Sequence, residues 1–159
     1  MSNNKGYIIV GWILLTLYLG QHLLDIRWEY LESLQTGEMF NRWTGLALGI
    51  YILSQWFLTP VRLNKMLEKN NQLFTTIHKW MGAIAPLVFY IHTMYLGYAY
   101  LFFLSITFFS NYALGLLNPE VIKTKANWYL QGWMIAHVAF SLLISMLMIY
   151  HVWMVFYYE

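Results

Sequence analysis

Apolar segments alternate with short polar stretches along the chain, and this pattern predicts membrane helices. The first two apolar segments are Tyr7 to Leu24 and Trp43 to Leu58, and the last runs from about Asn127 to the C-terminus. Each is compatible with the roughly 20 residues that an α-helix needs to cross about 30 Å of hydrocarbon. We expect Pro60 to end the second helix, because proline interrupts the hydrogen bonds of a helix.

The central apolar segment, Leu73 to Leu117, is too long for one membrane crossing. As a continuous helix it would extend roughly 70 Å. We expect a break near Gly97, with one helix ending at about Tyr95 and the next running from about Tyr98 to Leu117. The alternative is one long third helix followed by a partly buried loop, which gives four membrane helices instead of five.

The distribution of charged residues favours five helices with a cytoplasmic N-terminus. Cytoplasmic loops of membrane proteins are enriched in Lys and Arg. Five helices place on the inner side Lys5, Arg62, Lys65, Lys69, Lys79, Lys123 and Lys125. The outer side receives Arg27, Arg42 and most of the acids, which are Asp25, Glu29, Glu32, Glu38 and Glu159. Four helices would separate Lys123 and Lys125 from the other basic loop.

Composition agrees with a protein embedded in lipid. Of the 159 residues, 60% are hydrophobic and 10% are charged, whereas a soluble domain carries about 25% charged residues. We therefore predict an all-α, polytopic membrane helical bundle, with one transmembrane domain over residues 1–159, in a bacterial inner membrane. The net charge of +2 comes from scattered residues, and no basic stripe indicates nucleic acid as a partner.

Four of the five histidines form two pairs with the same spacing. His78 and His92 are fourteen positions apart, as are His137 and His151. Fourteen residues of an α-helix come within about 40° of whole turns and extend about 21 Å. Each pair therefore projects from roughly one face of its helix, with one histidine toward each surface of the membrane.

Small residues accompany these histidines at helical spacing. Gly82 and Ala85 lie four and seven positions after His78, and Ser141 lies four positions after His137. Residues at such spacings share a face of a helix. They would leave room for a flat macrocycle between helices, so we interpret them as candidate cofactor-binding residues.

Haem is the cofactor that this spacing favours. A bis-imidazole haem iron takes one histidine from each of two helices, and two such pairs would bind two haems. The sequence has no cysteine, which removes thiolate ligands and covalent attachment of haem. Zinc and copper clusters need several ligands within a few Å, which separations of about 21 Å within a pair prevent. The alternative is that the histidines only form hydrogen bonds between helices.

The number of helices decides how the histidines would pair. With five helices the third and fifth run parallel, so that His78 pairs with His137 and His92 with His151. With four helices they run antiparallel, and His78 pairs with His151 and His92 with His137.

These residues resemble the ligands of dihaem membrane b-type cytochromes. The stretch "TGLALGIYILSQWFLTP" (Thr44 to Pro60), then a short basic loop, "HKWMG" and His92, is similar to the ferric reductase-like transmembrane domain. That family includes the haem-binding membrane subunit of methionine sulfoxide reductase and the NADPH oxidases. The resemblance covers mainly Trp43 to Tyr95, and the end of the chain looks equally like respiratory cytochrome b subunits. It implies two non-covalent b haems, with iron ligands at His78, His92, His137 and His151.

Other polar residues lie near the predicted membrane boundaries. Lys79 and Arg42 are candidates to pair with haem propionates, and interfacial anchoring explains them equally well. His22 lies close to Asp25 at the outer end of the first helix. It is a candidate for a quinol site, where a titratable group accepts a proton, or an interfacial histidine solvated by headgroups.

We therefore expect a dihaem membrane cytochrome that relays electrons between a quinone or redox partner protein and an acceptor, as a subunit of a larger membrane complex. No Gly-x-Gly-x-x-Gly motif for a dinucleotide occurs, so a self-contained NADPH-driven reductase is not expected. Two alternatives are a small quinol-linked or ferric reductase, which would make the chain an enzyme, and a haem-free structural membrane subunit.

Overall fold

The computed structural model describes residues 5–64 and 69–158, and its regular structure in these ranges is entirely helical. The predicted all-α class is confirmed. Contacts divide the chain into two compact units, Met1–Met94 and Tyr95–Glu159. Lys65 and Glu159, which entered the charge argument, lie outside the described residues.

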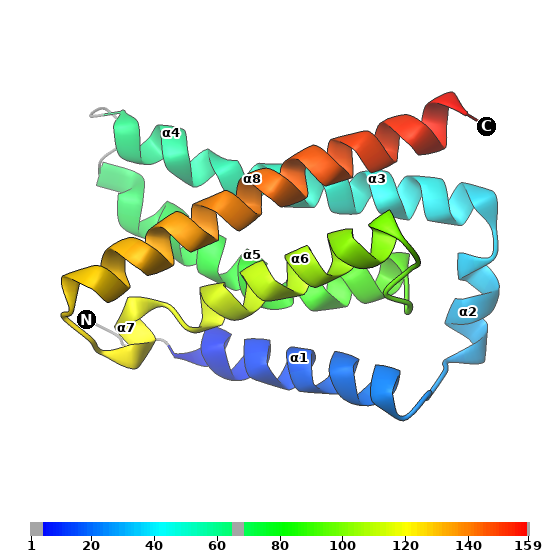
Figure 1. Ribbon diagram of the computed structural model, residues 1–159, viewed down its shortest axis with the longest axis horizontal. Helices are drawn as coiled ribbons and strands as arrows, with labels where there is room; N and C mark the ends of the chain where they lie inside the picture. The colour runs from blue at the N-terminus through cyan, green and yellow to red at the C-terminus, as the bar shows by residue number, and fades with distance from the viewer. Residues whose placement is uncertain (1–4, 65–68, 159) are drawn as a thin grey trace. The chain divides into compact units, whose positions relative to one another are not determined.

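Within residues 5–64 and 69–94, the first unit contains three long helices and several shorter ones (Figure 1). In chain order the elements are α1 (Gly6–Leu23), α2 (Glu29–Gln35), α3 (Glu38–Ser54), the 3₁₀ helix η1 (Gln55–Phe57), α4 (Leu58–Leu63) and α5 (Asn71–His92). α5 packs against α1 on one side and against α3, η1 and α4 on another.

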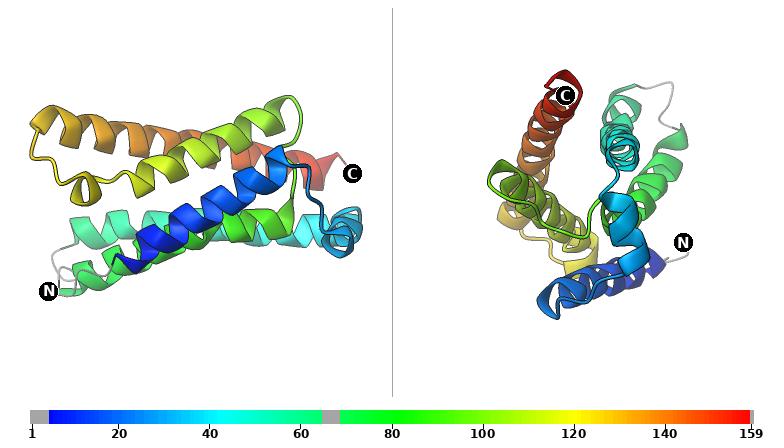
Figure 2. Two further views of the ribbon diagram at one scale, coloured as in Figure 1. Left: turned by 90° about the horizontal axis from the view of Figure 1, so that it is seen from below. Right: turned by 90° about the vertical axis from the view of Figure 1, so that its right-hand side faces the viewer.

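α1 and α5 pack against each other and run in the same direction, and α1 crosses α5 obliquely in the left view of Figure 2. Near their N-terminal ends, the Lys79 ammonium lies 5.6 Å from the centre of the Tyr7 ring. Near their C-terminal ends, Tyr18 makes edge-on ring contacts with Phe89 and Tyr90. Contacts in the same order along both helices establish the parallel direction.

α3 and α5 run antiparallel. The Tyr51 hydroxyl donates to the Met81 carbonyl at 2.5 Å, and the N-terminal part of α3 meets the C-terminal end of α5. Because α5 lies against both α1 and α3, it is the central helix of the first unit.

The second predicted helix continues beyond its expected end. We expected Pro60 to stop it after Leu58, but α3, η1 and α4 follow one another without a break to Leu63. Pro60 lies in the first turn of α4, where backbone N–H groups have no partner within that helix. The missing proline donor therefore costs little, and the 3₁₀ turn before it absorbs the change in hydrogen bonding.

The second unit consists of α6 (Tyr100–Leu116), the short α7 (Pro119–Ile122) and α8 (Asn127–Tyr157). α6 and α8 pack antiparallel: the Trp133 indole donates to the Leu114 carbonyl at 2.7 Å, and the Asn111 amide donates to the Ser141 hydroxyl at 2.9 Å. The side chain of Asn118 accepts from the Glu120 N–H and caps α7.

The helix break predicted near Gly97 is confirmed. α5 ends at His92 and α6 begins at Tyr100, so the alternative of one long third helix is wrong. Gly97 has a φ of +78°, in the left-handed region that glycine adopts without strain. A Cβ atom at this position would lie 2.6 Å from the Cβ of Leu101, so a side chain does not fit.

Among the described residues, three helical stretches are long and apolar enough to span a membrane: Gly6–Leu23, Glu38–Leu63 and Asn127–Tyr157. They indicate an integral membrane protein. α6 is apolar but has only 17 residues. α5 does not reach the same mean hydropathy, because its N-terminal half carries polar residues such as His78 and Lys79.

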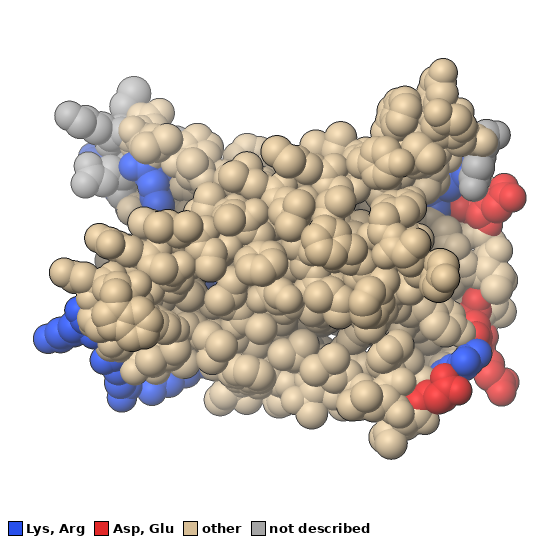
Figure 3. All heavy atoms as spheres, in the orientation of Figure 1, with Lys and Arg blue, Asp and Glu red and all other residues tan. Residues whose placement is uncertain are grey.

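Acidic side chains gather at one end of the first unit, where Arg27 and Arg42 also lie. The end formed by α2 and the adjoining ends of α1 and α3 carries the acids, which gather there in Figure 3: Asp25, Glu29, Glu32 and Glu38. The opposite end carries Lys5 at the start of α1 and Arg62 in the last turn of α4. This separation agrees with the charge asymmetry expected of a membrane protein.

Candidate functional site

His78 lies in the first half of α5 and contacts the 3₁₀ turn η1. Its Nδ1 atom is 3.3 Å from the backbone carbonyl oxygen of Gln55. A carbonyl oxygen only accepts hydrogen bonds, so in this contact Nδ1 carries the proton and Nε2 carries the lone pair. Histidines bound to metals commonly donate their other ring N–H to a carbonyl in this way.

His92 is the last residue of α5 and lies against α3. Its Nδ1 atom is 3.3 Å from the Thr44 hydroxyl oxygen. That hydroxyl donates its own proton to the Phe40 carbonyl at 2.7 Å, so its oxygen accepts from the histidine N–H. In a neutral ring, this contact places the lone pair of His92 on Nε2, as the contact with Gln55 does for His78.

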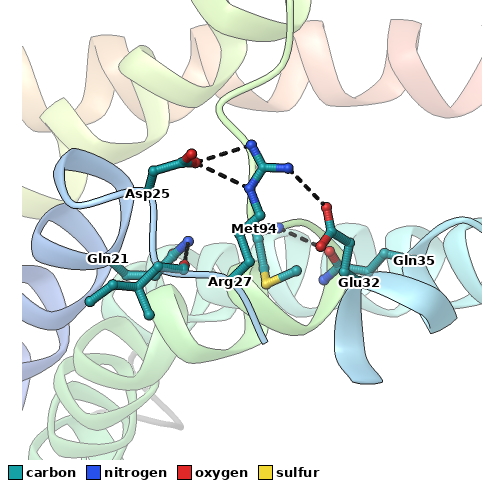
Figure 4. Close-up of polar contacts among 7 residues, drawn as sticks. Gln21, Asp25, Arg27, Glu32, Gln35 and Met94 are labelled. Carbon is teal, nitrogen blue, oxygen red and sulfur yellow. Dashed lines mark hydrogen bonds and ion pairs between the residues drawn. The ribbon is translucent and has the colours of Figure 1, made fainter. Parts of the chain in front are cut away.

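Hydrogen bonds of the Gln35 side chain hold the C-terminal end of α5, where His92 stands, and Figure 4 shows the bond to Met94. The Gln35 amide nitrogen donates to the carbonyls of Tyr90 and Ile91 at 2.8 and 3.1 Å. The Gln35 amide oxygen accepts from the Met94 N–H at 3.2 Å. One side chain of α2 thus binds both sides of the helix end where His92 stands.

His137 lies in α8 and faces α6. Its ring stacks on Trp133, with 5.5 Å between ring centres and 6° between ring planes. A Cβ atom added to Gly115 of α6 would lie 3.8 Å from its Cε1 atom. The ring of His137 is therefore held between an aromatic neighbour on its own helix and a residue without a side chain on the next.

His151 lies in the second half of α8. Its Nδ1 atom is 3.3 Å from the hydroxyl oxygen of Tyr100, at the start of α6. A phenol hydroxyl both donates and accepts, so this contact permits either form of the neutral ring. In three of the four predicted ligands, an oxygen atom from a neighbouring element thus faces Nδ1.

The small residues predicted to leave room for a cofactor have different surroundings. A Cβ atom on Gly82 would meet no atom within 4 Å, so the chain leaves open space beside this residue. Ala85 is buried. Ser141 donates to the His137 carbonyl at 2.7 Å and accepts from Asn111, so it also joins α6 to α8.

The two cations predicted to pair with propionates have partners within the first unit. Lys79 lies over the ring of Tyr7 at the contact between α5 and α1. An Arg42 nitrogen is 3.9 Å from a Glu38 carboxylate oxygen, one turn earlier on α3. Lys79 belongs to the N-terminal end of α5, and Arg42 to the acidic end of the first unit.

His22 is exposed in the last turn of α1, beside a network of polar contacts. In this network the Gln21 amide donates to the Ile26 carbonyl at 2.8 Å. The Arg27 guanidinium binds the carboxylates of Asp25 and Glu32 at 3.1 and 3.3 Å (Figure 4). These contacts stabilise the conformation of the connection between α1 and α2.

The structure places each histidine pair on one continuous helix, as the spacing predicted: His78 and His92 on α5, His137 and His151 on α8. The two helices belong to different units. Within residues 5–64 and 69–158, no group of three or more His, Cys, Asp or Glu side chains could hold a metal ion. A bis-imidazole haem iron needs only two protein ligands.

Sequence reasoning did not identify the oxygen atoms that face the histidines. Thr44, Tyr51 and Gln55 supply the contacts of α3 and η1 to α5, at intervals of seven and four positions. Such intervals keep residues on one face of a helix. This pattern was a usable signal, although Thr44 and Tyr51 lie in a stretch that is otherwise largely apolar.

Comparison with known proteins adds no assignment. No protein-family model, no curated protein and no solved structure matches the chain.

Proposed function

We propose that the chain is a dihaem b-type membrane cytochrome, with His78, His92, His137 and His151 as the iron ligands. The observation that carries this proposal is the environment of the two histidines on α5. Each directs an Nδ1 proton at an oxygen atom, which leaves the lone pair on Nε2. Neutral imidazole in this form is the state that binds a metal.

The residues present fit a b haem in their chemistry. Four histidines supply two pairs of nitrogen ligands, and cysteine for covalent attachment is not needed. When bound, each haem would supply a one-electron couple between ferric and ferrous iron. The chain contributes the Gln55 carbonyl and the Thr44 hydroxyl, which hold two rings in a defined form, and open space at Gly82.

Charge supports the parallel pairing of histidines. His78 is on the N-terminal half of α5, and Lys123 and Lys125 precede α8, whose first histidine is His137. If basic ends face the cytoplasm, α5 and α8 both run outward. His78 then pairs with His137, and His92 with His151. This arrangement uses five membrane-spanning helices with the N-terminus inside a bacterial inner membrane.

Two axial histidines leave iron no open position, so such haems favour electron transfer over binding of oxygen or substrate. Two haems at different depths would carry electrons between the faces of the membrane. The donor and acceptor are then a quinone and a redox partner protein, or two partner proteins. We accordingly place the chain as a subunit of a larger membrane complex.

The absorption spectrum of the purified, detergent-solubilised chain tests the proposal. We expect a Soret band, a reduced α-band at about 560 nm and two haems per chain. The H92A variant should retain about one haem. The matched control is H22A, which removes an exposed histidine outside the proposed ligands and should retain two. A native-membrane preparation without these bands would contradict the proposal.

One observation favours a second function, that of a haem-free structural membrane subunit. Three of the four histidines, His78, His92 and His151, lie within hydrogen-bonding distance of a neighbouring element of their own unit, as expected if histidines only join helices. A haem-free structural subunit would show no Soret band. The same spectrum therefore separates the two functions.

A further inference from the structure

Thr44 forms a two-step hydrogen-bonded chain between His92 and the backbone of α3. The hydroxyl donates to the Phe40 carbonyl at 2.7 Å, and its oxygen lies 3.3 Å from Nδ1 of His92. Because the hydroxyl proton is directed at Phe40, the oxygen is oriented to accept from the imidazole. Threonine here does more than bond to its own helix, as serine and threonine within helices often do.

Gly45, the next residue, lets the imidazole approach α3. A Cβ atom on Gly45 would lie 2.8 Å from Cε1 of His92 and 3.3 Å from Nδ1. Any side chain would therefore displace the ring from Thr44. The two adjacent residues place His92 by complementary means, since one supplies an acceptor and the other supplies space.

We propose that Thr44 and Gly45 are positioning residues that set the orientation and redox potential of the haem bound by His92. This inference rests on the proposed function. The acceptor at Nδ1 makes the imidazole a stronger electron donor through Nε2, which stabilises ferric iron relative to ferrous iron. Removing the acceptor therefore raises the midpoint potential of that haem.

His78 faces a backbone oxygen, whereas His92 faces a side-chain oxygen. A substitution can therefore affect the haem bound by His92 without affecting the one bound by His78. His78 donates to a backbone carbonyl, which no side-chain substitution removes. A change at Thr44 should therefore move one of the two potentials and leave the other in place. A general loss of stability would not act on one haem alone.

The test is a spectroscopic redox titration of the purified holoprotein with T44V, which keeps the size of threonine and removes the hydroxyl. We expect two haems, with one midpoint potential raised, and T44S should restore the wild-type titration. The matched control is T107V in α6: Thr107 is buried and bonds to the Phe103 carbonyl at 2.7 Å, as Thr44 does to Phe40.

Other outcomes are decisive as well. Should T44V fail to fold, T44C provides the weaker acceptor, and an unshifted potential in a folded T44C would overturn the inference. G45A should retain about one haem, so two haems with wild-type potentials would also overturn it. Wild-type protein without haem contradicts the proposed function itself, whereas wild-type haems unaffected by T44V contradict only the role of Thr44.

Discussion

The last turn of an α-helix leaves carbonyl groups without hydrogen-bond donors in the helix. At the end of α5, the Gln35 side chain supplies a donor. Its nitrogen donates to two successive carbonyls, of Tyr90 and Ile91, and its oxygen accepts from the first N–H beyond Thr93. The side chain of Asn41 in turn donates to the Gln35 carbonyl. Gln35, in the short helix α2, thus forms hydrogen bonds with the end of α5 and with Asn41 of α3.

Replacing Gln35 by alanine should lower the free energy of unfolding by about 1–3 kcal/mol, because the helix-end groups lose partners in a half-buried environment. The measurement is denaturant unfolding in detergent, followed by circular dichroism. Q131A removes an exposed glutamine of α8 and should change stability by less than about 0.5 kcal/mol. Equal stability of Q35A and Q131A would show that these contacts contribute nothing.

Helix ends in this chain are set by backbone conformation rather than by apolar pattern. No change in hydrophobicity marks the connection between α5 and α6, and only Gly97, with its φ of +78°, indicates it in the sequence. Ala99 also has a positive φ, +52°, with a ψ of −121°, a combination that its Cβ atom disfavours. Two residues with positive φ close together prevent helical continuation and define the turn.

G97A should destabilise the chain by about 1–3 kcal/mol, because alanine is strained at positive φ and its Cβ would meet Leu101 at 2.6 Å. G132A is the matched control. A Cβ at Gly132, inside α8, meets no atom within 4 Å, so alanine should be neutral or stabilise the helix by up to about 1 kcal/mol. Unfolding midpoints measured side by side test this, and a neutral G97A would contradict it.

The sequence predicts the elements better than their contacts. Hydropathy and one glycine identify the long helices, and the spacing of histidines correctly predicts that each pair lies on one helix. The prediction that Pro60 ends the second helix was wrong, because proline ends a helix only where its missing N–H would have had a partner within that helix. Thr44 and Gln55 were missed as neighbours of histidines, because their roles follow from how α3 packs against α5 and not from local pattern.

At the scale of the whole molecule, charge is the main guide to orientation. The first unit has an acidic end and a basic end, and Lys123 and Lys125 lie in the connection that leads to α8. A membrane potential and anionic lipids act on such charges together. On the proposed topology, the connection after α5 is outside and the connection before α8 is inside.

Single cysteines test this arrangement, since the chain has none of its own. Tyr98 is 88% exposed in the connection before α6, and Glu120 is exposed in α7. A membrane-impermeant maleimide should label Y98C in intact cells, whereas E120C should react only after the membrane is opened. The cysteine-free chain controls for background, and labelling of both variants from outside would contradict five spans.

The position of α5 between α1 and α3 has a consequence for biogenesis. Its N-terminal half is too polar to enter a bilayer readily alone, whereas α1 and α3, against which it packs, each belong to a stretch that is long and apolar enough to span a membrane. On the proposed topology, the translocon would release α1 and α3 first, and α5 would partition into lipid only against a protein surface already in place. Insertion of the helix that carries His78 and His92 would thus depend on the helix that carries Thr44, so ligand placement and membrane integration would be one event.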